Sequence, residues 1–123
     1  MRRFVVCLIC FYAVLPAFAS SEKSYSETWA AANKGTLNVR LQDGTRCDVL
    51  TPTHAVEVSF AKDWQDAVGR ALYQAAQLNK HAGILLILEN EKDSVYRERL
   101  DTTISVFNLP IEVWEVGAGA ATK

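Results

Sequence analysis

The amino-acid sequence predicts an α/β protein, a three-layer α/β/α sandwich with a mixed sheet and the element order α-β-β-β-α-β-α-β. Two observations carry this prediction. Residues 36–60 hold three short runs rich in β-branched side chains, separated by turn signals, which is typical of antiparallel hairpins. Residues 64–116 then alternate between helical and strand patterns, which is typical of parallel strands joined by helical crossovers.

The folded domain is predicted to begin with a short helix over residues 25–34, which are rich in helix formers and include Glu27. Gly35 follows at the position that suits a left-handed C-cap. Apolar and polar residues then alternate over 36–41, which predicts a strand.

A hairpin turn is predicted at Asp43-Gly44, the clearest short turn signal in the chain. With a two-residue turn at this point, Val39 pairs with Asp48. Apolar side chains, among them Leu37 and Leu50, would then surround Asp48 and cover its face of the sheet in part.

Two carboxylates lie on the next pair of predicted strands, which Pro52 separates. If Leu50 lies opposite Ala55, antiparallel register places Asp48 opposite Glu57. The same register places Arg46 opposite Ser59 on that face and turns Cys47, Val49, Val56 and Val58 to the other. Such a pair of acids is either solvated, paired with arginine, or occupied in binding a cation, and the sequence leaves these alternatives open.

One long amphipathic helix follows at residues 64–78, where apolar side chains recur with the spacing of one helix face. Gly69 lies inside it and either allows close approach of another backbone or is a tolerated surface glycine. The continuous apolar run 83–88 predicts a buried strand, the pattern over 93–107 a helix, and residues 111–116 a final strand.

The N-terminal residues 1–19 have the order of a secretory signal peptide: Arg2 and Arg3, an apolar run, and Ala17-Phe18-Ala19 as a cleavage site. A retained membrane anchor is the alternative, but the apolar run is short for a transmembrane span. We therefore expect no membrane anchor after cleavage, a periplasmic or secreted protein, a single domain over 20–116 and a flexible tail over 117–123.

Cysteine content and charge narrow the function classes further. Cys47 is the one cysteine after residue 19, so no internal disulfide is expected, and we predict a buried small side chain there. Without Arg2 and Arg3, 11 basic residues face 14 acidic ones, a net charge near −3. This balance does not support non-specific binding to nucleic acid, and the oligomeric state is not predicted.

The histidines and tryptophans show no functional pattern along the sequence. His54 and His81 are predicted in a hairpin loop and at a helix end, without a metal-ligand spacing. Trp29, Trp64 and Trp114 fall one per element, so we place them in the core; a stacking platform would need them exposed together.

The element order and three acids resemble the PD-(D/E)XK, or restriction-endonuclease-like, nuclease superfamily. Glu27 falls on the first helix, Asp48 on the second strand and Glu57 on the third, and GRALYQA at 69–75 resembles the helix motif of resolvase-like and exonuclease-like members. The resemblance implies that Asp48 and Glu57 bind Mg²⁺ and that Glu27 supports them. It covers most of the chain after residue 19.

Two departures from that family stand out. Ser59 occupies the position of the family lysine, and Arg70 occupies a helix position often held by glutamine, with Gln74 one turn later. A serine supplies no positive charge, and the guanidinium of Arg46 does not deprotonate to act as a base. Lys62 is the candidate replacement; its alternative is an exposed lysine at a helix start.

Two functions follow as hypotheses: an exported nuclease with Mg²⁺-dependent phosphodiester hydrolysis, or an inactive member of the fold that serves as a periplasmic binding or assembly module. The candidate catalytic residues are Glu27, Asp48, Glu57 and Lys62. The candidate binding residues are Arg46, Ser59, Arg70 and Gln74, and the candidate metal ligands are Asp48 and Glu57.

Overall fold

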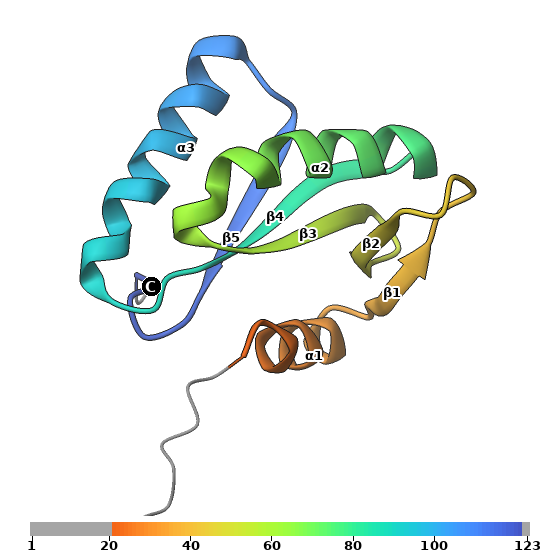
Figure 1. Ribbon diagram of the computed structural model, residues 1–123, viewed down its shortest axis with the longest axis horizontal. Helices are drawn as coiled ribbons and strands as arrows, with labels where there is room; N and C mark the ends of the chain where they lie inside the picture. Colours follow the sequence, from red (N-terminus) through yellow and green to blue (C-terminus); the bar gives the residue numbers. More distant parts are fainter. Residues whose placement is uncertain (1–20, 122–123) are drawn as a thin grey trace, which may run out of the picture.

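The computed structural model describes residues 21–121 and shows an α/β fold with one five-stranded mixed sheet and three α-helices (Figure 1). The α/β class and the mixed sheet are confirmed. The predicted signal peptide, residues 1–19, lies outside the described residues. Over the described range, no helix combines the length and the apolar character needed to cross a membrane.

The elements follow one another along the chain with short connections, and two single 3-10 turns precede the second and third helices. Their bounds are α1 Glu22–Ala32, β1 Thr36–Arg40, β2 Arg46–Leu50, β3 His54–Phe60, α2 Trp64–Leu78, β4 His81–Ile87, α3 Ser94–Phe107 and β5 Ile111–Val116, with 3-10 turns at Ala61–Asp63 and Glu91–Asp93.

The sheet runs in chain order, β1-β2-β3-β4-β5. The pairs β1–β2 and β2–β3 are antiparallel, whereas β3–β4 and β4–β5 are parallel. Parallel neighbours need a crossover, which α2 and α3 provide. The edges of the sheet are therefore β1 and β5.

Apolar side chains fill both faces of the sheet. On one face α1 packs through Ala30 and Trp29 over Val56, Val58 and Leu85. On the other face α2 and α3 pack over β3 and β4, with small alanines of α2 directly against the strands (Figure 1). Strand β4 is buried on both faces, which explains its continuous apolar sequence.

The β1–β2 hairpin differs from the prediction by one residue. Val39 lies opposite Cys47, not Asp48, because the loop has three residues in place of two. The Leu41 amide donates to the Thr45 carbonyl oxygen at 2.8 Å, and Gly44 adopts φ +87° between them. A three-residue loop with a left-handed glycine is the next commonest hairpin connection, and Asp-Gly suits it as well as the shorter turn.

Strand β2 pairs with β3 over a short length. Leu50 lies opposite Ala55 as predicted, and Val49 lies opposite Val56, but the ladder ends there. Arg46 and Ser59 therefore do not form the predicted cross-strand pair.

The prediction for Cys47 is also wrong as to its face. Val49, Val56 and Val58 belong to the core under α1 as predicted, whereas Cys47 is buried on the α2 side. Strict alternation along β2 therefore fails between Cys47 and Val49. The predicted burial of Cys47 is confirmed, since its side chain is fully enclosed.

The space around Gly35 and Gly69 shows why each position holds or tolerates a glycine. A Cβ atom at Gly35 would lie 2.5 Å from Val49 Cγ1, so Gly35 lets the chain after α1 pass close to the sheet, and it is not the C-cap of α1. A Cβ atom at Gly69 would meet nothing within 4 Å. The second alternative for Gly69, a tolerated surface glycine, is therefore the correct one.

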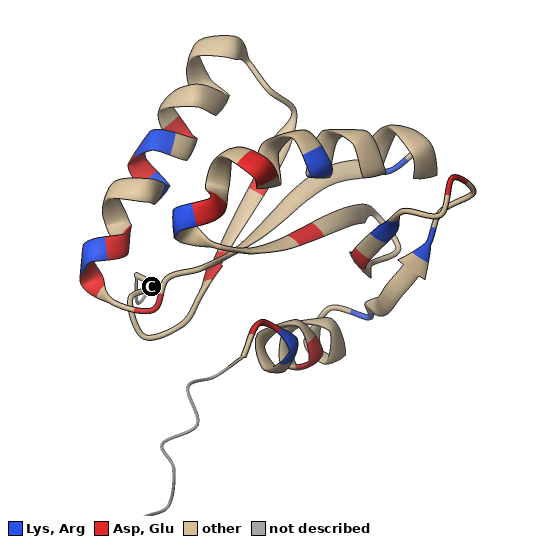
Figure 2. Ribbon diagram, viewed as in Figure 1, with Lys and Arg blue, Asp and Glu red and all other residues tan. Residues whose placement is uncertain are grey.

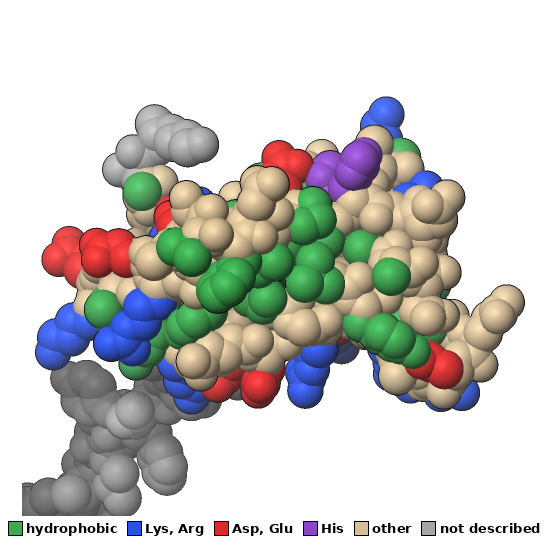
Figure 3. All heavy atoms as spheres, turned by 90° about the horizontal axis from the view of Figure 1, so that it is seen from above, with side chains coloured by type: hydrophobic (Ala, Val, Ile, Leu, Met, Phe, Trp, Pro, Cys, Tyr) green, Lys and Arg blue, Asp and Glu red, His purple; other side chains and the backbone are tan. Residues whose placement is uncertain are grey.

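Residues after β5 turn back onto the end of β4. The amide of Gly119 donates to the Leu88 carbonyl oxygen at 2.8 Å, and the amide of Ala121 donates to Glu115 Oε2 at 3.2 Å. Figure 3, a view from above Figure 1, shows apolar side chains gathered over the middle of that face, with histidine atoms beside them. The large apolar residues with the greatest exposure are Tyr73, Val95, Val106 and Phe107.

Candidate acidic active site

Acidic side chains from α1, β2, β3, α2 and the 3-10 turn before α2 meet around a cavity of about 320 Å³ at the end of β3. Figure 2 shows acidic positions on α1, β2, β3 and the first turns of α2. The carboxylates come from sequence positions up to 44 residues apart, counted from Glu22 to Asp66. The lining residues are Glu22, Asp48, Glu57, Val58, Ser59, Phe60, Asp63, Asp66, Ala67 and Arg70.

Glu57 is the most enclosed of these acids, with 5% of its surface exposed. Gln74 Nε2 donates to Glu57 Oε2 at 2.9 Å and also to the Arg46 carbonyl oxygen at 3.0 Å. Arg70 Nη1 lies 3.6 Å from Glu57 Oε1, but its side chain is largely exposed. Burial and the charge of Asp48 raise the pKa of Glu57 from 4.5 to about 7.

Asp48 lies at the point where β2 and β3 separate. Its Oδ2 accepts a hydrogen bond from the Val58 amide at 2.8 Å, so its carboxylate replaces the missing ladder partner. Asp48 lines the cavity with Glu57 and also a second cavity, of about 350 Å³, on the α1 side. The two predicted metal ligands are thus neighbours, although a backbone ladder does not join them.

The first helix contributes a different acid from the one expected. Glu22 lines both cavities, and loss of hydration together with the charge of Asp48 raises the pKa of its carboxyl group. Glu27 lines only the second cavity, with Asp48, and forms an exposed ion pair with Lys23 at 3.8 Å. Glu22 was missed because the helix was expected to begin at Tyr25.

An earlier helix start was readable from the sequence. The Ser21 hydroxyl accepts a hydrogen bond from the Ser24 amide at 3.3 Å, so Ser21 is the N-cap of α1. Serine followed by an acid in the first turn is a recognised start signal.

The candidate basic and polar residues divide into two groups. Arg70 and Ser59 line the acidic cavity, and Gln74 lies directly behind Glu57. Lys62 is exposed in the 3-10 turn before α2 and is not among the lining residues. Arg46 contributes its backbone carbonyl oxygen to Gln74 and not a guanidinium to the cavity. Among the described residues, Arg70 thus supplies the one cationic group in the lining.

No protein-family model, curated protein or solved structure gave a significant match to this chain.

The chemistry available at this site is that of a carboxylate pair. Across residues 21–121, no group of three or more histidine, cysteine or acidic side chains is arranged to hold a metal ion. Mg²⁺ does not require such a cage, because it keeps several waters and is commonly held by one or two carboxylates. Asp48 and Glu57 fit that requirement, and a divalent cation bound between them would offset the burial and the charge of Asp48 that raise the pKa of Glu57.

A second cluster of side chains was not expected from the sequence. The rings of Trp29 and Trp114 lie 5.0 Å apart between centroids, and the rings of His54 and Trp114 lie 5.2 Å apart between centroids at an interplanar angle of 77°. His54 Nε2 lies 2.8 Å from Glu112 Oε2, and the rings of His54 and His81 lie 5.4 Å apart. The histidines are the first residues of β3 and β4, which parallel pairing places side by side.

Proposed function

We propose that the chain is an exported, nuclease-like protein that hydrolyses phosphodiester bonds with Mg²⁺ at the acidic cavity. We further propose that it has the three-layer α/β/α sandwich of the restriction-endonuclease-like fold. The observation that carries the proposal is Glu57, a buried carboxylate beside Asp48 in an acid-lined cavity. A buried carboxyl group whose pKa is raised by burial and by a neighbouring charge is typical of functional sites.

Each residue has a defined part in this proposal. Asp48 and Glu57 would hold the cation, and Gln74 orients Glu57 through the hydrogen bond at 2.9 Å. Arg70 is positioned to bind a phosphate oxygen electrostatically. When bound, Mg²⁺ lowers the pKa of a coordinated water and neutralises charge on the scissile phosphate.

The alternative, an inactive member of this fold that acts as a binding or assembly module, is favoured by one observation. Ser59 stands where the resemblance places a lysine, and Lys62 does not line the cavity. In that case the cation site would remain while hydrolysis is absent.

Metal titration tests the cation site, which both proposed functions share. We expect the melting temperature to rise with Mg²⁺ or Mn²⁺, by about 2.7 kcal/mol of added stability at a concentration one hundred times Kd. The double variant Asp48→Asn, Glu57→Gln should lose this response, whereas Glu98→Gln, on the exposed surface of α3, should keep it. A wild-type melting temperature that does not change with millimolar Mg²⁺ or Mn²⁺ would rule out the cation site.

Cleavage of labelled single-stranded and duplex DNA and RNA separates the two functions. Metal-dependent cleavage that disappears in the double variant supports the nuclease. Metal binding without any cleavage supports the assembly module. Cleavage retained by the double variant would show that the activity comes from elsewhere.

A further inference from the structure

Two histidines and one glutamate gather where the parallel strands begin, at the opposite end of β3 from the acidic cavity. His54 and His81 are the first residues of β3 and β4 and lie opposite each other in the parallel register. Glu112, the second residue of β5, pairs with Gly83 of β4. Residues two apart on a strand share a face, so His81 lies on the face of position 83 and therefore on that of Glu112. The sheet thus presents all three side chains on one face.

The spacing of these side chains is close to that of ligands on one metal ion. A cavity of about 500 Å³ is lined by all three residues. His54 Nε2 lies 2.8 Å from Glu112 Oε2, and the ring centroids of His54 and His81 lie 5.4 Å apart. On a tetrahedral zinc ion, two imidazole ring centres are roughly 5 Å apart, and a nitrogen and a carboxylate ligand atom roughly 3.3 Å apart. Both spacings agree with a zinc site to within about half an ångström.

Small side-chain movements would complete the set of ligands. Within residues 21–121, no three such side chains are already arranged to hold a metal ion. His81 is exposed, so rotation about its side-chain torsions can turn a ring nitrogen towards His54. The side chain of Glu112 is 56% exposed and is free to shift, whereas that of His54 is only 16% exposed. His54 is therefore the fixed ligand, and the other two adjust to it.

A hydrogen bond behind His54 prepares its Nε2 atom to bind a cation. Thr53 Oγ1 lies 2.7 Å from His54 Nδ1. When this hydroxyl oxygen accepts the Nδ1 proton, the free lone pair is on Nε2, which faces the Glu112 carboxylate. Histidines that bind metals almost always donate their other ring N–H in this way. A metal ion would then replace the proton that Nε2 and Glu112 otherwise share.

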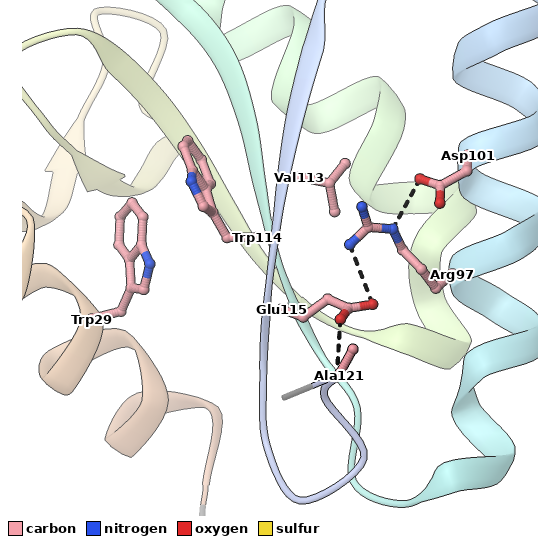
Figure 4. Close-up of a pocket in the computed structure, with 7 residues that line it drawn as sticks. All are labelled: Trp29, Arg97, Asp101, Val113, Trp114, Glu115 and Ala121. Carbon is pink, nitrogen blue, oxygen red and sulfur yellow. Dashed lines mark hydrogen bonds and ion pairs between the residues drawn. The ribbon is translucent and has the colours of Figure 1, made fainter. Parts of the chain in front are cut away.

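Three basic side chains lie near this cluster, but among the described residues none of them lines the cavity that both histidines share. Arg97 forms an ion pair with Glu115 on the side of β5 away from the two tryptophans (Figure 4). Lys80 Nζ donates to a backbone carbonyl oxygen at 2.9 Å. Lys34 lines an adjoining cavity of about 250 Å³ together with Glu112. Lys34 therefore competes with a metal ion for Glu112, and loss of its charge should tighten metal binding.

We propose that His54, His81 and Glu112 bind one Zn²⁺ ion. Imidazole nitrogens suit Zn²⁺, whereas Mg²⁺ prefers oxygen ligands, so the two histidines separate this site from the acidic cavity in its choice of metal. Two histidines and one carboxylate leave the fourth position of a tetrahedral ion for water. The proposal does not depend on the proposed function, because the two sites share no residue.

Isothermal titration calorimetry with Zn²⁺ tests this site. His81→Gln and Glu112→Gln should each weaken binding at least tenfold, because each removes a ligand, and even loss of a group that only orients a ligand costs about tenfold or more. Glu98→Gln, on the exposed surface of α3, should bind as the wild type does. The double variant Asp48→Asn, Glu57→Gln lacks the proposed Mg²⁺ ligands and should keep the histidine-dependent binding of Zn²⁺. Failure of either site is thereby seen separately.

Nitrogen NMR of the histidine rings gives a readout that a purely structural ion pair would not change. Zn²⁺ should shift Nε2 of His54 while the ring proton stays on Nδ1. Thr53→Val keeps the shape but removes the hydroxyl oxygen, and should weaken Zn²⁺ binding about tenfold. Lys34→Gln should strengthen it. The far-ultraviolet circular dichroism of each variant should match that of the wild type.

Four results would each overturn the proposal. They are no binding at millimolar Zn²⁺, unchanged affinity in His81→Gln or in Glu112→Gln, loss of Zn²⁺ binding in the double variant Asp48→Asn, Glu57→Gln, and coordination of Zn²⁺ through Nδ1 of His54.

Discussion

Replacing Glu57 by glutamine should change how the stability of this protein depends on pH. The buried carboxyl group has its pKa raised from 4.5 to about 7, so the folded state holds this proton more tightly than the unfolded state does. The contribution of Glu57 to stability is therefore fully present below about pH 4.5, where the group is protonated in both states, and it is lost as the pH rises towards 7. Above pH 7 the loss is complete.

The size of the effect follows from the shift. Each pKa unit corresponds to about 1.4 kcal/mol, so a shift from 4.5 to about 7 costs on the order of 3 kcal/mol at pH 8. Glu57→Gln keeps the shape and still accepts the hydrogen bond of Gln74, but carries no charge. At pH 8 the variant should be about 3 kcal/mol more stable than the wild type, and near pH 4.5 the two should be equal.

Urea denaturation from pH 4.5 to 9 at constant ionic strength, without divalent cations, measures this difference. Glu98→Gln, on the exposed surface of α3, is the matched control and should follow the wild type at every pH. If the free energies of unfolding of Glu57→Gln and the wild type differ by the same amount at every pH, the raised pKa of Glu57 is refuted. A variant less stable than the wild type at pH 8 would show that Gln74 and Arg70 stabilise the ionised carboxylate by more than its burial costs.

Three further substitutions test the packing around the site and the sheet. Gln74→Ala removes the donor to Glu57 and to the Arg46 carbonyl oxygen, and should lower the free energy of unfolding by about 2 kcal/mol in urea denaturation. The loss should be larger at pH 8 than at pH 5, because the hydrogen bond from Gln74 lowers the pKa of Glu57. Gly69→Ala should raise stability by about 1 kcal/mol, since its Cβ meets nothing within 4 Å; a loss would mean that the glycine serves a contact. Gly83→Ala places a Cβ 2.6 Å from a Trp114 ring carbon, so it should cost about 1–3 kcal/mol and alter tryptophan fluorescence, whereas unchanged emission would contradict this packing.

Much of the secondary structure was readable from local patterns. The apolar stripe over residues 64–78 predicted α2 at its observed bounds, and residues 111–116 predicted β5. The pairing of Leu50 with Ala55 followed from the short Pro52 loop. These features depend on neighbours a few residues apart, so the sequence by itself determined them.

The candidate site was predicted in its chemistry but not in its geometry. Asp48 and Glu57 lie together as expected, yet through a side-chain bond to Val58 and not through a cross-strand pair. Sequence analysis named Glu27 and not Glu22, because the helix was expected to begin at Tyr25, whereas both acids lie on α1. The rotation of α1 against the sheet decides between them, and that rotation depends on the packing of Trp29 and Ala30.

Only the tertiary structure shows which side chains meet at the ends and edges of the sheet. His54 and Glu112 are 58 positions apart, and parallel register through β4 brings them to 2.8 Å. Trp29 and Trp114 meet because α1 covers the face from which Trp114 projects. Periodicity along the chain specifies which side of a helix or strand is apolar. Which element packs against that side, and which strand lies at the edge of the sheet, depend on contacts between residues distant in sequence.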